Sequence, residues 1–329
     1  MMNEKVTWLL PTLNAEKYLA ETLTSVATQT YKNHQIIAWD NGSSDSTVEL
    51  LLKWIPSKIP GRVVHTQPFN LLGDCLAALV EAADTEYIAR IDADDIALPN
   101  RLQSQLSMFH SNPNIGLVAG RAKRIDSNGK QVSGILGRAC EAEEVPYAFL
   151  LGNPIVHPSI LAKRSVVLEA GNYASLGMGQ DLDLWYRVTM QSQIIISNKI
   201  VLKYRVHENS IGVNNRHKWA PLQYELWENY SSKLFPQLSK EKIMLIWLAA
   251  NPLASELPET YFSKFSREKA VDAYNELIET MRNIGSNKHL VLSKIHREIK
   301  RRVKGEKSKA LVFQFIDQFR DLIIRAVIR

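Results

Sequence analysis

Short apolar runs alternate with helix-like segments along residues 6–119. The runs short enough for single strands are Val6–Leu10, Gln35–Trp39, Arg62–Thr66, Glu86–Ile91 and Gly116–Ala119. Between them, apolar residues recur at helical spacing in Tyr18–Thr28, Ser46–Lys53, Cys75–Ala83 and Arg101–Ser111. Ser46 and Glu49 also match a capping box at a helix start. The alternation predicts an α/β fold in which helices cover a parallel sheet.

The pattern becomes less regular after about Asp126, where Asn128-Gly129 and Gly134 indicate turns. A second ordered region is expected from Asn153 to Val206. Its elements are a strand at Ser159–Ala162, a glycine-rich loop at Gly171–Gly179, a helix from Gln180 and a strand at Ile200–Tyr204. The spacing is helical from about His217. We therefore expect residues 1–215 to form an α/β domain and residues 216–329 a helical, basic C-terminal region.

Polar residues follow the strands at the ends where ligands bind in parallel sheets. They are Thr12, Asn14, Asp40, Asn41, Asp92, Asp94 and Asp95. The densest group is Arg90-Ile91-Asp92-Ala93-Asp94-Asp95, with three carboxylates within four residues. Like charges this close repel, and a divalent cation offsets that cost. The group therefore predicts a metal site that could bind a diphosphate, with a polar turn before a helix as the alternative.

Two other positions have both a chemical and a structural interpretation. Asp40 could accept a hydrogen bond from a nucleobase N–H or a ribose hydroxyl, or could only shape a loop. Asp181 could act as a general base or cap the helix that begins near Gln180. Asp183 is expected to be structural. Taken alone, His157 and His207 are expected to be ordinary polar or surface residues.

Several classes of protein are disfavoured by missing motifs. No phosphate-binding glycine motif follows the first strand, and no hydrolase nucleophile elbow is present. The two cysteines, Cys75 and Cys140, lie in no zinc-like cluster, so a reducing compartment is expected. We also expect no secretory signal and no membrane span, and hence a cytoplasmic protein.

The formal net charge of +6 is concentrated toward the C-terminus. Residues Arg282–Lys309 contain ten Lys and Arg but two Glu, and Leu311–Arg329 is amphipathic. This end could attach peripherally to an anionic membrane surface or pack as a helical appendage, and both interpretations stay open. Nucleic acid is not an expected partner, because no recognised motif accompanies the basic run.

Four segments, in this order, resemble the family 2 glycosyltransferases of the GT-A fold. The first is Leu10–Leu19, similar to PTYNxExYL, and the second is Gln29–Tyr31 with Asp40–Thr47, similar to QTYxxxEIIVVDDGSxDxT. The third is Asp92–Asp95, which matches the DxDD form of the DxD motif, and the fourth is Gln180–Trp185, similar to EDxDLW. The segments fall within residues 5–210, and Arg90 with Arg101–Gln105 resembles a bacterial polysaccharide-synthesis subgroup.

The resemblance implies a Rossmann-like GT-A domain and a role for each matching residue. Pro11, Thr12, Asn14, Asp40, Arg90 and Asp92 are expected to bind the nucleotide. Asp94 and His207 are expected to hold Mn²⁺ or Mg²⁺, and Asp181 to be the general base. Gln180, Asp95 and Trp185 are expected near the donor or acceptor sugar.

The implied reaction is inverting transfer of a sugar from a nucleotide-sugar, with a UDP-sugar expected, to a glycan or lipid-linked acceptor. Cell-surface polysaccharide synthesis is the expected process. Two residues depart from the family pattern: Asn41 replaces a second Asp, and Gln180 replaces a Glu beside Asp181. A catalytically weak or inactive nucleotide-sugar-binding protein of the same fold is therefore the alternative.

Overall fold

The computed structural model describes residues 4–65, 67–149, 152–208 and 216–251, with Leu257, Tyr261, Lys269, Asp272, Ala273, Glu276, Leu277, Glu279 and Thr280. The chain divides into two compact units. Unit 1 comprises Met1–Val145 and Pro154–Asn214, and unit 2 comprises Pro146–Asn153 and Asn215–Arg329. The basic run Arg282–Lys309 and the amphipathic end Leu311–Arg329 lie outside the described residues.

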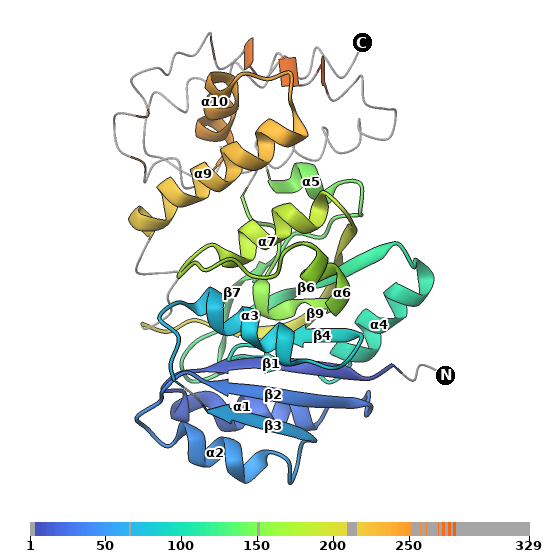
Figure 1. The fold of residues 1–329 in the computed structure, drawn as a ribbon, viewed down its shortest axis with the longest axis vertical. Coiled ribbons are helices and arrows are strands. Elements are labelled where there is room, and N and C mark those ends of the chain that lie inside the picture. Colours follow the sequence, from blue (N-terminus) through green and yellow to red (C-terminus); the bar gives the residue numbers. More distant parts are fainter. Residues whose placement is uncertain are drawn as a thin grey trace. The chain divides into compact units, whose positions relative to one another are not determined.

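A nine-stranded mixed sheet forms the centre of unit 1 among the described residues (Figure 1). Its strands are β1 Val6–Thr12, β2 His34–Asp40, β3 Gly61–His65, β4 Tyr87–Arg90, β5 Ile96–Ala97, β6 Ile115–Ile125, β7 Gln131–Leu136, β8 Leu161–Lys163 and β9 Gln193–Arg205. The spatial order is β3-β2-β1-β4-β8-β6-β9-β5, and β7 pairs with β6. The expected strands of residues 6–119 are therefore present, in an α/β fold.

Helices cover both faces of this sheet. They are α1 Glu16–Ala27, α2 Thr47–Trp54, α3 Leu72–Ala82, α4 Arg101–Ser111, α6 Arg164–Glu169 and α7 Gln180–Thr189, with a 3₁₀ turn at His157–Ser159. Trp8 and Leu10 of β1 lie in one core with apolar residues of α1, α2 and α4. Leu9 points to the opposite face because side chains alternate along a strand, and α3 packs on β1 there. Burial on both faces explains why the strand sequences are almost continuously apolar.

The sequence pattern predicted a parallel sheet, but the sheet is mixed. β1 pairs in parallel with β2 and β4, and β2 pairs in parallel with β3. β8 then lies between β4 and β6 and is antiparallel to both. The prediction failed because the regular alternation ends before β8. This strand belongs to the second ordered region, about 40 residues after β6 in the chain, and it inserts between β4 and β6.

The predicted capping box at α2 is also wrong. Ser46 is the N-cap residue, but its side chain makes no capping hydrogen bond. Asp45 does this work instead: its Oδ1 accepts from the backbone N and the hydroxyl of Thr47, at 3.0 and 2.5 Å. Glu16 of α1 accepts from the backbone N of Ser46 at 3.0 Å. A partner from another helix therefore replaces the local partner that the pattern indicated.

Unit 2 is helical where it is described. It includes α9 Arg216–Leu234 and α10 Lys240–Ala250, and most of the short α5, Val145–Ala148. The Phe149 ring packs edge-on against Tyr230, and Tyr147 lies 6.1 Å from Phe235 between ring centroids. These contacts join residues 146–149 to α9 and its end. Within the described part of the chain, no helix has the length and apolar character needed to cross a membrane.

Candidate functional site

Strand register brings the polar residues of β1, β2 and β3 to one edge of the sheet. Thr12 pairs with Asp40 across β1 and β2, and Asp40 pairs with His65 across β2 and β3. On the other side of β1, Leu9 pairs with Arg90, so the turn that contains Asp92 follows β4 at the same edge. Two polar groups result, one around Asp40 and one around the carboxylates of residues 92–95.

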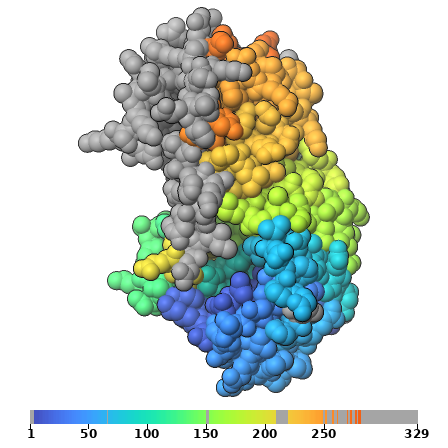
Figure 2. Space-filling model, turned by 60° about the vertical axis from the view of Figure 1, so that its left-hand side comes forward, coloured from blue at the N-terminus to red at the C-terminus, as the bar shows by residue number. Residues whose placement is uncertain are grey.

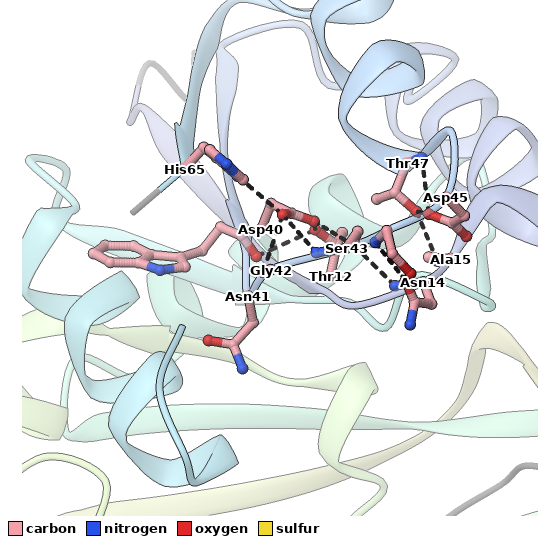
Figure 3. Close-up of polar contacts among 12 residues, drawn as sticks. Thr12, Asn14, Ala15, Asp40, Asn41, Gly42, Ser43, Asp45, Thr47 and His65 are labelled. Atoms are coloured by element: carbon pink, nitrogen blue, oxygen red, sulfur yellow. Dashed lines mark hydrogen bonds and ion pairs between the residues drawn. The ribbon is translucent and has the colours of Figure 1, made fainter. Parts of the chain in front are cut away.

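Asp40 is the centre of the first group (Figure 3). Its side chain is fully buried, and its Oδ2 accepts from the backbone N of Gly42 and of Ser43, at 3.1 and 3.0 Å. Its Oδ1 accepts from the hydroxyls of Ser43 and Thr12, at 2.5 and 3.3 Å. His65 Nδ1 lies 3.1 Å from Oδ2. Burial would raise the pKa of Asp40, but the hydrogen bonds outweigh burial and lower it.

The loop after β2 is tied to neighbouring segments by two asparagines. Asn14 has a left-handed φ of 48°, which Asn tolerates, and its Oδ1 accepts from the backbone N of Ser44 at 2.9 Å. Asn41 pairs with the backbone of Phe69: its Oδ1 accepts from the N at 2.7 Å and its Nδ2 donates to the O at 2.9 Å. Pro11 lies within β1, directly before Thr12. The edge of the expected nucleotide pocket is therefore shaped by internal hydrogen bonds.

The second group is the turn that contains Asp92, Asp94 and Asp95, here called the carboxylate turn. One potential ligand atom of each lies within 4.8 Å of the others. Asp95 is buried, and its Oδ1 accepts from the backbone N of Arg205 at 2.9 Å. Its Oδ2 is buried and has no hydrogen-bond partner in the described structure. Burial, together with the charges of Asp92 and Asp94, raises the pKa of Asp95 well above its ordinary value.

Arg90 offsets part of this negative charge. Its guanidinium is almost fully buried and makes two contacts with the Asp92 carboxylate, one of them a hydrogen bond of 2.5 Å. Even so, burial and the charges of Asp94 and Asp181 raise the pKa of Asp92 to about 6. Arg101, on α4, donates to the backbone O of Arg90 at 2.8 Å and to Gln105. Arg90 thus contacts a carboxylate in the structure, and α4 supports the strand end that carries it.

Arg205 is a site residue that the sequence interpretation missed. Its buried guanidinium donates to the backbone O of Asp94 at 2.9 Å and to Glu21 at 2.9 Å. It also lies 4.4 Å from the centre of the Tyr18 ring. Figure 2 shows the end of β9, in yellow, beside the green β6–β7 hairpin and the blue N-terminal segments. The sequence offered only a weak signal, because Arg205 is the last residue of a strand that also contains Lys199 and Lys203, two positions before His207.

His207 lies against the carboxylate turn. Its Nε2 is 2.9 Å from Asp94 Oδ2, and its ring centre is 5.4 Å from that of Tyr18. The two residues are 113 positions apart in the chain, so only the pairing of β9 in the sheet brings them together. This contact is what a shared metal site of Asp94 and His207 requires.

Helix α7 carries the remaining predicted residues. It begins after Gly179, whose φ of 75° suits glycine, and Asp181 lies in its first turn. The charge of Asp181 contributes to the raised pKa of Asp92, which places Asp181 in the same electrostatic environment. Gln180 is buried, with no partner for its Oε1 in the described structure. Asp183 pairs with Arg187 four residues later, a structural role as expected.

Trp185 of α7 and the partly buried His157 lie next to each other. Trp185 is fully buried and packs against the His157 ring, with centroids 5.6 Å apart. His157 Nε2 is 2.8 Å from the Tyr173 hydroxyl, and burial with the charge of Arg90 lowers the pKa of His157 well below its ordinary value. The structure therefore does not bring Trp185 to an exposed surface, whereas it brings Asp92, Asp94, Asp95 and His207 together.

Sequence comparisons match these segments to known proteins. The model of Glycosyl transferase family 2 matches residues 7–163. An uncharacterized glycosyltransferase of Methanocaldococcus jannaschii is 30% identical over 195 residues, 58% of this chain and 67% of that protein. The chain belongs to glycosyltransferase family 2. The UDP-Glc:alpha-D-GlcNAc-diphosphoundecaprenol beta-1,3-glucosyltransferase WfgD of Escherichia coli is 26% identical over 211 residues, 64% of this chain and 80% of WfgD.

Solved structures agree with the fold of this family 2 glycosyltransferase. S. aureus TarS 1-349 in complex with UDP-GlcNAc has a TM-score of 0.61 at 17% identity, covering 84% of this chain and 81% of that one. The mannosyltransferase PcManGT of Pyrobaculum calidifontis, in complex with GDP-Man and Mn2+, has a TM-score of 0.53 at 16% identity, covering 87% and 77%. The expectation of an α/β GT-A fold is confirmed.

The residues of the carboxylate turn fit a divalent metal ion. Their oxygens are the donors that hard cations prefer, and the partnerless Oδ2 of Asp95 is a buried polar atom that an ion could satisfy. His207 adds a nitrogen next to Asp94. A cation here would also offset the mutual repulsion that raises the pKa values of Asp92 and Asp95.

Proposed function

We propose that this family 2 glycosyltransferase transfers a sugar, with inversion, from a nucleoside-diphosphate sugar to a hydroxyl of a glycan or lipid-linked acceptor. The observation that carries the proposal is the meeting of Asp92, Asp94, Asp95 and His207 at the sheet edge, within the electrostatic reach of Asp181. In this proposal the carboxylates bind the diphosphate through a metal ion, and Asp181 is the base of a single displacement at the same site.

In this proposal the nucleoside lies along the ends of β1 and β2, by Pro11, Thr12, Asn14 and the loop that Asp40 holds. Asp94 and His207 would hold the divalent ion, Mn²⁺ or Mg²⁺, which would neutralise the charge of the leaving diphosphate. Arg90 keeps the Asp92 carboxylate oriented by two contacts. Asp95 fixes the turn through its hydrogen bond from Arg205.

Asp181 takes the proton from the attacking hydroxyl as the new glycosidic bond forms. Its position in the first turn of α7 stabilises the carboxylate before the reaction, because the helix N-terminus is electropositive. Gln180, unlike a Glu, adds no second negative charge beside Asp181. We propose that the Gln180 amide faces the sugar.

We propose a UDP-sugar as donor and cell-surface polysaccharide synthesis as the process. The support is the names of relatives: WfgD is a UDP-Glc-dependent glucosyltransferase, and AmsE of Erwinia amylovora is an amylovoran biosynthesis glycosyltransferase, 28% identical over 222 residues. We propose that residues 1–215 carry out the transfer and that the basic region 216–329 meets an anionic membrane surface.

A thermal-shift panel of UDP-, GDP-, CDP- and TDP-sugars, each with and without Mn²⁺, tests the proposal. A ligand at 100 times its Kd stabilises the folded state by about 2.7 kcal/mol. We expect metal-dependent stabilisation by one nucleotide class, lost in Asp94→Ala but kept in Glu49→Gln, which changes an exposed carboxylate on α2. Asp181→Asn should keep this stabilisation while kcat falls about 10²- to 10⁴-fold.

Two results would contradict the proposal. If no nucleotide-sugar stabilises the wild-type protein, the site does not bind such donors. If Asp181→Asn transfers sugar at the wild-type rate, Asp181 is not the base, although donor binding at the carboxylate turn would stand.

A further inference from the structure

The end of β2 is occupied by the protein's own hydrogen bonds. The Asp40 carboxylate receives four donated hydrogen bonds and the His65 contact, while a carboxylate offers about four lone-pair sites. The Asn41 carbonyl accepts a hydrogen bond from the backbone N of Phe69, and its amide donates one to the backbone O of Phe69. The Asp40 carboxylate therefore cannot accept an N–H from a nucleobase without giving up an internal partner.

His65 differs from both, because its side chain is 57% exposed while it contacts the fully buried Asp40. An ionised carboxylate is an acceptor only, so the Nδ1 of His65 must donate the hydrogen bond. In the neutral ring the proton is then fixed on Nδ1, and Nε2 becomes an acceptor. No hydrogen bond of Nε2 occurs within the described part of the chain.

The position of His65 suits the far end of a nucleotide. It ends β3, and the sheet order β3-β2-β1-β4 separates it from the carboxylate turn after β4 by three strand spacings. At about 4.8 Å per spacing this is roughly 14 Å, comparable to an extended nucleoside diphosphate. A diphosphate at the carboxylate turn therefore places its base near the end of β3.

We infer that His65 is the residue that selects the nucleobase of the donor, with its Nε2 accepting the ring N–H of a uracil, thymine or guanine. The inference rests on the proposed function. Cytosine and adenine present a ring nitrogen acceptor at that position, so they would oppose a second acceptor. Asp40 acts as the positioning residue, because it sets the tautomer and the orientation of the ring (Figure 3).

The test compares the binding of UDP and CDP, each with Mn²⁺, by calorimetry on the full chain at pH 8. His65→Asn is the informative variant, since an Asn amide can still donate to Asp40 but offers nothing at the position of Nε2. We expect its Kd for UDP to rise about tenfold, the effect of one lost hydrogen bond, with little change for CDP. The preference for UDP over CDP should shrink by the same factor.

His110→Asn is the matched control. His110 also contacts a carboxylate, with its Nε2 2.7 Å from Glu4 Oε1, but it lies in the last turn of α4, and Glu4 precedes the start of β1. The His110→Asn variant should leave the Kd values for UDP and for CDP unchanged. His65→Ala, which removes both ring nitrogens, should lose the preference as well, and its melting temperature reports any loss of folding.

The outcomes separate the two proposals. If wild type binds no nucleotide, the proposed function fails. If wild type binds UDP, and His65→Asn weakens UDP and CDP equally, the ring contacts a ribose or phosphate group and base selection by His65 is wrong. Unchanged binding of both nucleotides in His65→Asn would also overturn the inference.

Discussion

At the scale of single residues, the site depends on how each buried charge is matched. Arg205 has almost no exposed surface, yet its guanidinium reaches Glu21 and the backbone O of Asp94. Asp40 is equally buried and accepts from four different residues. Buried charges persist only when they are paired or hydrogen-bonded, so these side chains hold the loops that their partners belong to.

His34 is a buried histidine, and its protonated form has no carboxylate partner among its described contacts. It begins β2, its side chain is buried, and its Nδ1 has no hydrogen-bond partner in the described structure. Burial, with a smaller contribution from Lys32, lowers the pKa of His34 to about 4. The unfolded chain takes up this proton below about pH 6.5, so falling pH favours unfolding.

We therefore expect His34→Leu to flatten the pH dependence of stability. Between about pH 6.5 and pH 4 the wild type should lose roughly 3 kcal/mol of unfolding free energy that the variant keeps. Urea denaturation at several pH values measures this. His110→Leu is the control: a hydrogen bond with the Leu106 backbone O and the contact with Glu4 raise the pKa of His110, so its effect has the opposite sign. Parallel curves for wild type and His34→Leu would contradict the assignment.

At the scale of elements, α3 determines where the loop before α7 lies. The backbone N of Gly73, near the start of α3, donates to the backbone O of Leu176 at 3.0 Å. A Cβ on Gly73 would lie 2.0 Å from the backbone O of Ala174. The close approach of two backbones requires glycine here, and it places the segment that leads to Asp181.

Gly73→Ala should therefore move this loop. We expect a stability loss of about 1–3 kcal/mol from overpacking, and a kcat about 10²-fold lower because Asp181 is displaced. Nucleotide binding should change little, since the β1 and β2 ends are untouched. Gly177→Ala is the matched control in the same loop, where a Cβ would meet only Leu71 Cδ2 at 3.4 Å. Equal kinetics for the two variants would show that the loop position is not set at Gly73.

At the scale of the whole molecule, the complete sheet belongs to unit 1, while residues 146–153 belong to unit 2. Tyr147 and Phe149 are buried, and their ring partners are Phe235 and Tyr230. A chain cut after residue 214 keeps the strands and the carboxylate turn but loses these partners. Two large aromatic side chains, each worth about 150–250 Å² of buried area, would become exposed.

A chain that ends at residue 214 and carries Tyr147→Ser and Phe149→Ser should thus fold and bind nucleotide. We expect its Kd for the donor nucleotide to stay within a few-fold of the full chain, measured by calorimetry. The same truncation without the two substitutions should be less soluble, because an exposed apolar patch promotes association. An unfolded circular-dichroism spectrum for the substituted truncation would show that unit 1 needs unit 2 to fold.

The sequence by itself determined the elements of residues 6–119, except the two-residue strand β5, and the polar residues that end the strands. This was possible because hydrophobic periodicity and short motifs are local: Val6–Leu10, α4 and the Asp92–Asp95 turn each depend on neighbours in the chain. The family resemblance added the metal-binding role expected of His207, and the structure places His207 next to Asp94.

Only the tertiary structure decided which elements pair and which charges are buried. The insertion of β8 between β4 and β6, the burial of Arg205 and the contact of His65 with Asp40 join segments that are 25 to more than 100 residues apart. No local pattern encodes such partners, because they follow from sheet order and from the need to satisfy every buried polar group. Asp40 was predictable as a strand-end carboxylate, whereas its occupied oxygens, and so the role inferred for His65, were not.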